Sequence, residues 1–404
     1  MRPVASRSML HDVVIIGAGP VGATLALALA DAGLDVVAFD SRAEGTVGRG
    51  DRSLALSHGA RLIFERLGVW SAVAAAPAAV TPIMAIDISQ RGGFGHARLD
   101  AGEQGLPALG YVVSYRALQA ALDAALARSG CEIRYDCAAT RIGATPAYAT
   151  IEATQGGAAF ESTARLVALA DGGGELADKA RRSHDYGQVA LVGKLTPREP
   201  HHGVAFERFT PEGPMALLPL GNRYGLVWTT TPARANALLA LSDVEFLAQL
   251  ADRFGSRAAL RHDALSGFEH IAERQTFPLR LEYASRIVDE RRVLLGNAAQ
   301  ALHPVAGQGF NLGLRDAYEL AQELLATPRE AIGARDHLAA YARRRRPDRM
   351  AGIAFTHGLL GVFGTDAPLL SWPRGLALTL LDSLPAVKHA FTRAMLFGIH
   401  QGTL

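Results

Sequence analysis

The sequence predicts an α/β protein with three parts: a Rossmann-like unit, an interleaved and mainly antiparallel β-sheet, and a helical C-terminal region. Three observations predict it. A strand, a glycine-rich turn and a helix follow one another over residues 12–33, β-rich runs separated by turn signals fill residues 183–231, and mostly apolar segments broken by prolines follow the arginine-rich residues 341–350.

Length and composition set limits on these parts. A chain of 404 residues exceeds one ordinary core, yet no Pro-, Ser- or charge-rich stretch resembles a linker, so we expect two interleaved domains. The net charge of +2 predicts no nucleic-acid partner. Cys131 and Cys137 fit neither zinc spacing nor a redox pair, which indicates two inert thiols in a reducing compartment, the cytoplasm.

The apolar N-terminal run is a dinucleotide fingerprint rather than a signal peptide or membrane span. Residues 13–30 divide into a short buried strand, three spaced glycines, and a helix expected over residues 23–32 that Gly33 ends. A second strand at residues 35–39 finishes in an acid that can accept hydrogen bonds from a ribose. The predicted cofactor contacts are Gly17, Gly19, Pro20, Val21, Gly22, Asp40, Ser41 and Arg42.

Two later strand ends decide which dinucleotide is bound, since FAD and NAD share this fingerprint. Strands expected at residues 166–170 and 292–295 end in Asp171-Gly172 and in Gly296-Asn297. Each dipeptide alone favours an ordinary turn. Their order, after the fingerprint and before the loop described next, favours an extended FAD. No second fingerprint follows a strand, so NAD(P)H is expected to bind only transiently.

A glycine-dense loop leads into a helix at residues 304–312. Its pattern is Pro304-x-x-Gly307-Gln308-Gly309-x-Asn311, followed by Leu312. Such a loop exposes backbone N–H groups at a helix N-terminus, where the helix dipole favours negative charge. A reduced flavin carries its charge at the N1/C2 carbonyl edge. These residues are therefore predicted to bind the flavin and to stabilise its reduced form.

These motifs resemble those of the group A flavoprotein aromatic hydroxylases, which have the p-hydroxybenzoate hydroxylase fold, and within them the polyprenylphenol hydroxylases of ubiquinone biosynthesis. The resemblance runs almost end to end. Gly-Asn-Ala-Ala-Gln at residues 296–300, in place of the commoner Gly-Asp-Ala-Ala-His, resembles the 2-octaprenyl-6-methoxyphenol hydroxylase branch, as does the block at residues 206–220. The most specific stretches are residues 52–57, 110–118, 186–188, 205–220 and 295–316.

The resemblance implies a role for each matching residue. It places the three fingerprint glycines at the FAD pyrophosphate and Asp40 at the ribose, and it implies that Arg52 and Arg116 reach the phosphates or the ribityl chain. Without the family resemblance, Arg52 and Arg116 would be interpreted as ordinary solvated residues. Asp171 matches an Asp-Gly element that touches FAD, and Asn297 takes a ribityl-contacting position. Glu175 departs from the family, which usually has serine there.

The chemistry that the resemblance implies is hydroxylation of an activated phenol. NAD(P)H reduces FAD, O2 adds at the flavin C4a position, and the electron-rich ring attacks the resulting hydroperoxide. The protein then has to hold the ring, favour its phenolate character and exclude water. No Ser-His-Asp set, carboxylate pair or metal cluster is evident or needed. His303 and Pro304 are the residues nominated near the chemistry, and a structural hydrogen bond is the alternative for His303.

The β-rich middle predicts an antiparallel sheet that roofs the flavin. Runs at residues 188–194, 204–209 and 224–230 are expected to form its strands, and residues 82–99 to add to it. Residues 216–220 and 225–228 either line a ring-binding pocket or pack in the core. The expected units are residues 1–75, 108–182 and 276–342 for FAD binding, 76–107 and 183–275 for the sheet, and 343–404 for the helical end.

The C-terminal region raises the question of a membrane partner. Residues 341–350 hold five arginines against Asp348 alone, and the apolar segments that follow are expected to be broken into short helices by Pro368, Pro373 and Pro385. None of these helices is long enough to span a bilayer. The pattern is compatible both with a peripheral membrane surface that admits a polyprenyl tail and with a helical cap whose arginines are solvated.

Two functional hypotheses of different class follow. The first is an NAD(P)H- and FAD-dependent monooxygenase that uses O2 on a polyprenylated phenol at the inner face of the membrane. The second is a flavin-bearing scaffold within a quinone-biosynthesis complex. Hydroxylation of another aromatic substrate, and an oxidase or dehydrogenase on the same fold, are further alternatives. A homodimer is expected from the family alone. Ring position, tail length and NADH or NADPH preference are not encoded in these motifs.

Overall fold

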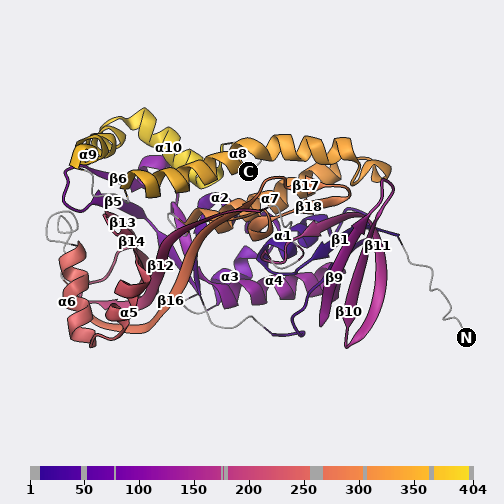
Figure 1. Ribbon diagram of the computed structural model, residues 1–404, viewed down its shortest axis with the longest axis horizontal. Helices are drawn as coiled ribbons and strands as arrows, with labels where there is room; N and C mark the ends of the chain where they lie inside the picture. The colour runs from indigo at the N-terminus through magenta and orange to yellow at the C-terminus, as the bar shows by residue number, and fades with distance from the viewer. Residues whose placement is uncertain are drawn as a thin grey trace, which may run out of the picture.

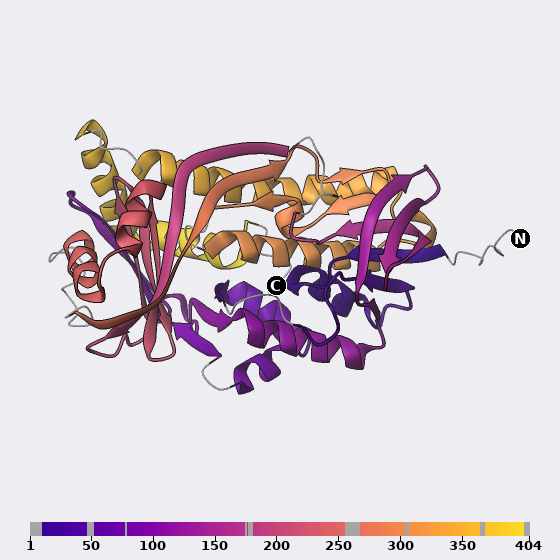
Figure 2. The ribbon, with the colours of Figure 1, turned by 60° about the horizontal axis from the view of Figure 1, so that its bottom comes forward.

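The computed structural model describes residues 10–46, 52–76, 79–173, 176, 181–254, 267–303, 307–363 and 368–399. Two large sheets lie toward opposite ends of the long axis of the molecule (Figures 1 and 2). A third sheet has three strands. The expected α/β class is confirmed.

The first sheet has the order β17-β18-β11-β1-β2-β8, and its central pairs are parallel. The central strand β1 carries Val13, Val14 and Ile15, which are fully buried in a core formed with α1, α4 and α7 and with strands β9 and β10. Its strands are β1 (Leu10–Ile16), β2 (Val36–Phe39), β8 (Glu132–Arg134), β9 (Cys137–Ala144), β10 (Ala149–Gln155), β11 (Ala158–Leu169), β17 (Val288–Asp289) and β18 (Arg292–Leu294).

The helix after β1 begins earlier than the sequence predicted. The prediction of residues 23–32 was wrong: α1 spans Pro20–Leu29. Gly19 is its N-cap and Pro20 occupies the first turn, where the missing proline N–H costs no hydrogen bond. The chain leaves the helix through a turn in which the Ala32 N–H donates to the Leu29 carbonyl, before Gly33 adopts a φ of +69°.

The second sheet is mainly antiparallel, as predicted, with the order β19-β16-β12-β15-β14-β13-β5-β6 and one parallel pair, β13 with β5. Helices α5 (Pro232–Leu239) and α6 (Asp243–Phe254) cover one face. The expected unit limits at 182/183 and 275/276 fall inside β12 and β16. The strands are β5 (Ala85–Gln90), β6 (His96–Asp100), β12 (Arg181–Pro197), β13 (Val204–Thr210), β14 (Gly213–Leu220), β15 (Arg223–Thr230), β16 (Phe268–Ala284) and β19 (Gln300–Ala301).

A small sheet and several helices connect these two parts. Strand β7 (Gly110–Ser114) pairs with β3 (Ser53–Ser57) and β4 (Val80–Ile83), and helix α4 (Tyr115–Ser129) follows β7 directly. The remaining helices are α2 (His58–Arg66), α3 (Trp70–Ala75), α7 (Gln308–Leu325), α8 (Arg335–Phe363), α9 (Pro368–Ser383) and α10 (Pro385–Phe397), with short 3-10 turns at Gly102–Gln104, Gly296–Ala298 and Arg329–Ala331.

The C-terminal helices differ from the prediction in two ways. Pro368 and Pro385 do begin helices, but Pro373 lies within α9 and does not break it. The first helix is also long, since α8 runs for 29 residues through Pro347. Within the residues that the structure describes, no helix has the length and apolar character needed to cross a bilayer.

The arginine run is solvated only in part: Arg343 and Arg346 are exposed, whereas Arg345 and Arg349 are buried. The prediction that the run faces water or lipid was therefore wrong for Arg345 and Arg349. Arg345 is 0% exposed and lies among three acids. Its guanidinium donates to Asp316 at 2.8 Å, to Glu319 at 2.7 Å and to Asp348 at 2.9 Å. Asp316 and Glu319 come from α7, so this buried network joins α7 to α8.

The same network reaches other parts of the chain. Arg315 donates to Asp348 at 2.8 Å, and the backbone N–H of Ile399 donates to the other carboxylate oxygen at 3.2 Å. Burial opposes ionisation of Asp348, but Arg315 and Arg345 outweigh it and lower the pKa of this carboxyl to about 2. The network therefore ties the end of α10 to α7 and α8.

The buried network predicts a large stability difference between two neighbouring arginines. Arg345→Ala leaves Asp316, Glu319 and Asp348 buried without their shared cation, so we expect the free energy of unfolding to fall by about 3–5 kcal/mol. Arg346 is exposed, and Arg346→Ala is expected to change the free energy of unfolding by less than about 0.5 kcal/mol. Chemical denaturation of both variants measures the difference, and equal effects would contradict the assignment.

Candidate active site

The predicted cofactor residues meet at one edge of the first sheet. Ile16 of β1 is in register with Phe39 of β2 and with Leu169 of β11, and Leu169 is in register with Leu294 of β18. Because these strands are parallel, their carboxyl ends share one edge, which is where ligands bind in open α/β sheets. The residues that follow the four strands are Gly17, Asp40, Asp171 and Asn297.

The three fingerprint glycines have different physical requirements. Gly17 has a φ of +97°, and a Cβ there would lie 2.7 Å from the carbonyl oxygen of Ala170. A Cβ on Gly22 would lie 1.9 Å from the carbonyl oxygen of Gly17, so the helix packs directly on the turn. A Cβ on Gly19 would meet nothing within 4 Å, and its φ is an ordinary −63°. Neither packing nor conformation explains Gly19, whereas a ligand close to the backbone does.

Asp40 is buried and fixes the shape of the fingerprint turn. Its carboxylate accepts hydrogen bonds from the Ala18 N–H at 2.6 Å, from the Arg42 N–H at 2.8 Å and from the Arg42 guanidinium at 3.0 Å. The Ala18 carbonyl accepts in turn from Arg42 and from the side chain of Gln119, both at 3.1 Å. Gln119 lies on α4 and is fully buried, and no sequence signal singled it out.

Asp171 and Asn297 end neighbouring strands and lie on adjacent turns. One carboxylate oxygen of Asp171 accepts from the Gly173 N–H at 3.0 Å. This oxygen therefore stabilises the turn, as the sequence predicts for an Asp-Gly dipeptide taken alone. The side chain of Asn297 is exposed, while its backbone carbonyl accepts from Arg181 at 2.9 Å. A Cβ on Gly173 would lie 3.1 Å from that same carbonyl, which shows how closely the two turns pack.

The helix that follows the glycine-dense loop begins without a side-chain cap. Gly307 is the N-cap of α7 with a φ of +60°, and this residue makes no side-chain capping hydrogen bond. Asn311 is buried and its side chain is fully used: the amide donates to the Ala55 and Gly307 carbonyls at 3.0 and 2.8 Å, and its oxygen accepts from the Ser57 N–H at 2.8 Å. Gln308 and Gly309 are half-buried and Leu312 is buried. Pro304 lies outside the described residues.

Helix α7 packs against the fingerprint region through glycines that sequence inspection did not single out for packing. A Cβ on Gly313 would lie 2.9 Å from the Cα of Gly296, and a Cβ on Gly296 would lie 3.2 Å from Val21. The start of α1, the Gly296 turn and α7 therefore touch one another. Spacing gives a signal for Gly313, since it lies four residues after Gly309 on the same helical face.

The two predicted arginines lie near each other at the start of α4. The Arg52 guanidinium sits 4.7 Å above the Tyr115 ring, and the Tyr115 N–H donates to the Arg52 carbonyl at 2.9 Å. Arg116 is the next residue and is exposed, as is Arg52. Their contact with FAD stays a prediction.

His303 is buried at the end of the second sheet, next to Tyr186. The two rings meet edge to face with centroids 5.7 Å apart, and the Tyr186 hydroxyl lies 3.1 Å from Nδ1 of His357. Burial lowers the pKa of His303 to about 4, so its imidazole is neutral at neutral pH. It can exchange hydrogen bonds, but it does not supply a positive charge.

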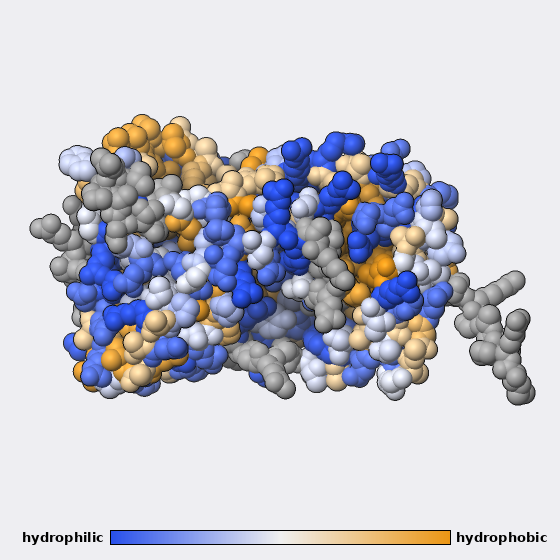
Figure 3. Space-filling view, viewed as in Figure 1, coloured by the Kyte–Doolittle hydropathy of each residue, from blue (hydrophilic) through white to orange (hydrophobic). Residues whose placement is uncertain are grey.

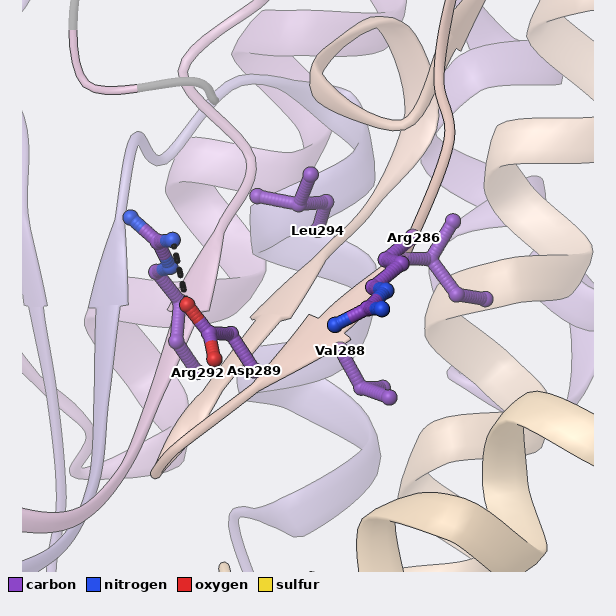
Figure 4. Close-up of a pocket in the computed structure, with 6 residues that line it drawn as sticks. Arg286, Val288, Asp289, Arg292 and Leu294 are labelled. Carbon is purple, nitrogen blue, oxygen red and sulfur yellow. Dashed lines mark hydrogen bonds and ion pairs between the residues drawn. The ribbon is translucent and has the colours of Figure 1, made fainter. Parts of the chain in front are cut away.

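A small pocket lies elsewhere, on the β17–β18 hairpin (Figure 4). Its polar lining includes the ion pair of Arg292 with Asp289 at 3.1 Å. None of the residues that line it is a predicted site residue. The lining residues are Arg286, Ile287, Val288, Asp289, Arg292 and Leu294.

The residues at the sheet edge fit FAD. The acid at the end of β2 suits an adenosine. The open space beside Gly19 and the start of α1 suit a pyrophosphate, and polar groups follow β11 and β18 at the same edge. The start of α7 suits an anionic ring system, because neither Gly19 nor Gly307 makes a side-chain capping hydrogen bond. Fold and site together define a flavoprotein of the FAD-dependent oxidoreductase class. The chain belongs to the family described as FAD binding domain, whose match covers residues 11–356.

Two curated relatives span nearly the whole chain. Ubiquinone hydroxylase UbiL of Rhodospirillum rubrum is 34% identical over 403 residues, which cover 96% of this chain and 90% of the relative. The 3-demethoxyubiquinol 3-hydroxylase of Escherichia coli is 29% identical and covers 93% and 96%. These matches confirm the resemblance to the ubiquinone-biosynthesis hydroxylases. The crystal structure of p-nitrophenol 4-monooxygenase PnpA from Pseudomonas putida has the same fold, with a TM-score of 0.74, 19% identity and coverage of 95% and 96%.

The glycine geometry predicts that two substitutions of the same size act on different properties. Gly19→Ala meets open space, so we expect an apoprotein of unchanged melting temperature whose affinity for FAD falls about tenfold or more. Gly22→Ala places a methyl group against the Gly17 carbonyl, so we expect the apoprotein itself to be destabilised. Thermal melting and FAD titration separate the two, and normal FAD binding by the Gly19 variant would contradict the cofactor placement.

Proposed function

We propose that this protein is an FAD-dependent monooxygenase that uses NAD(P)H and O2 to hydroxylate the ring of a polyprenylated phenol in ubiquinone biosynthesis. The observation that carries the proposal is the combination of an FAD-type sheet edge with a second, antiparallel sheet in one chain. The chain is also similar over nearly its whole length to relatives named as ubiquinone and demethoxyubiquinol hydroxylases. When FAD is bound, it supplies the redox chemistry and the reaction with oxygen.

The chain's own residues have three tasks in this proposal. The start of α7 at Gly307 would stabilise negative charge on a bound flavin through backbone N–H groups and the helix dipole. Asn311 holds that helix start on β3 through two hydrogen bonds, with Ala55 and Ser57, and donates a third to the Gly307 carbonyl. His303 acts as a neutral hydrogen-bonding group beside the loop, since its lowered pKa keeps it uncharged at neutral pH.

The scaffold and oxidase alternatives differ from a hydroxylase in how NADH, oxygen and product are coupled. We expect purified holoprotein to consume NADH slowly alone, and at least ten times faster with 2-prenylphenol, with one hydroxylated product formed for each O2. A scaffold would show little turnover in either case. An oxidase would consume oxygen without hydroxylating the phenol. Oxygen uptake and product analysis on the same sample distinguish the three outcomes.

We also propose peripheral attachment to the inner face of the membrane, through α9 rather than through the arginine run. Trp372 is 74% exposed, and Leu376 and Leu380 follow it at four-residue intervals on the same face. Figure 3 shows an apolar surface at the end of the molecule where Figure 1 places α9. Phe94 packs against Trp372 with ring centroids 5.1 Å apart and widens this face. Such a face suits insertion into the acyl boundary of a bilayer.

Vesicle binding tests this surface. Leu376→Asp puts a charge on the apolar face of α9, and we expect it to reduce co-sedimentation with phosphatidylglycerol-containing vesicles by about tenfold or more. Val244 is 79% exposed, against 53% for Leu376, but it lies on α6, so Val244→Asp is the control and is expected to bind as wild type does. Equal binding by all three proteins would reject α9 as the membrane face.

A further inference from the structure

The two faces of the antiparallel sheet differ in exposure. On the face covered by α5 and α6, Met215, Leu217 and Trp228 are completely buried. On the opposite face, Ala216, Leu218 and their neighbours on β15 remain partly exposed. Side chains alternate along each strand, and residues in register on neighbouring strands lie on the same face. The register therefore decides which residues belong to each face. The partly exposed face is apolar yet incompletely covered, which is typical of the wall of a binding site.

This open face packs against the small sheet formed by β3, β4 and β7. Ala205 of β13 packs with Ile83 of β4 and Val112 of β7, and Leu218 packs against the same group. Strands β4 and β7 form the small sheet that also contains β3, and Asn311 at the start of α7 is hydrogen-bonded to β3. The open face and the start of α7 therefore both contact the same small sheet.

One carboxyl group interrupts this apolar face. Glu207 lies on β13, in register with Ala216 of β14 and with Ile88 of β5, so its nearest neighbours across the sheet are apolar. At the open-face positions of β5, β13, β14 and β15, the other ionisable residue is Arg223, which is exposed at the β14–β15 turn. The Glu207 side chain is partly exposed.

The titratable groups on the elements around this face have other partners. Lys194 of β12 pairs with Glu273 at 2.8 Å, and Lys388 of α10 pairs with Asp382 at 3.1 Å. The His357 ring meets the Tyr186 hydroxyl, Tyr111 packs on Trp70 and Arg393 lies over Phe397. Desolvation alone therefore raises the pKa of Glu207, to about 8.

We propose that Glu207 is the catalytic residue that binds the phenol hydroxyl of the substrate and accepts its proton. The inference rests on the proposed function and adds the residue that orients the ring. The phenol O–H bond breaks, the proton goes to a carboxylate oxygen of Glu207, and the electron pair stays on the phenolate oxygen, where it activates the ring. The carboxylic acid returns its proton to water when the product leaves.

The surroundings of Glu207 suit this task. A lone carboxyl on an apolar wall gives a ring one polar anchor, so the ring binds in one orientation. A carboxyl with a pKa of about 8 is also a better match for a phenol, whose pKa is about 10, than an ordinary glutamate is. Since the carboxylate form is the base, activity is expected to rise with pH through about 8.

The experiment compares wild type, Glu207→Gln and Glu269→Gln holoenzymes with 2-prenylphenol and with a ring-fluorinated 2-prenylphenol that ionises near neutral pH. Glutamine keeps the size of the side chain but cannot take a proton, and Glu269 is an exposed residue of β16 that serves as the charge control. We expect Glu207→Gln to lower kcat/KM for 2-prenylphenol about 100-fold or more and to abolish the rise near pH 8. With the fluorinated phenol, the loss is expected to shrink to less than tenfold.

The outcomes separate this inference from the function on which it rests. Unchanged kcat/KM and an unchanged pH profile in Glu207→Gln would overturn the inference alone, as would an equal loss with both phenols, which indicates a structural role. Absence of hydroxylation by wild type with both probes would overturn the proposed function and this inference together. Melting temperature is measured in parallel, and at pH 8 the glutamine variant is expected to be at least as stable as wild type, because it removes an ionisable group from an apolar face.

Discussion

The buried contact between Arg345 and three acids, Asp316, Glu319 and Asp348, fixes the arrangement on which the site depends. It joins α7 to α8 and holds the helix whose first turn faces the flavin position. The network continues into strand β19: Gln300 donates to Asp316 at 2.6 Å and accepts from Arg349 at 2.9 Å, while Arg349 also donates to the Ala284 and Ala299 carbonyls. Buried charges of this kind are costly unless each one is paired, so the network tolerates few alternative positions of α7.

This constraint explains how distant parts of the chain build one site. The parallel sheet gathers Gly17, Asp40, Asp171 and Asn297 at its carboxyl edge, and the charged network sets α7 against that edge. Asn311 then ties the start of α7 to β3, and the small sheet carries the contact onward to the antiparallel sheet. The residue Gln300, which marks this branch in sequence, thus has a physical role in linking α7 to α8.

Local signals in the sequence predicted the fingerprint, both sheets and the uncapped α7, because each depends on spacing within a short stretch. The arginine run was misjudged because the partners of Arg345 lie on α7, far from it in sequence, and only Asp348 was visible nearby. Pro373 was expected to end a helix, but it is the sixth residue of α9, and the helix continues through it with one backbone hydrogen bond fewer. Glu207 gave no signal, since its surroundings depend on the pairing of β13 with β5 and β14.

The most direct test of the hydroxylase account is mass spectrometry of quinone intermediates in cells that lack this protein, restored with the intact gene or with an Asp171→Ala version. The account predicts that a polyprenylphenol lacking one hydroxyl group accumulates and that only the intact gene removes it. The position of the missing hydroxyl would then give the ring position of the reaction. Unchanged quinone intermediates in the deletion strain, or full rescue by a protein shown to bind no FAD, would contradict the account.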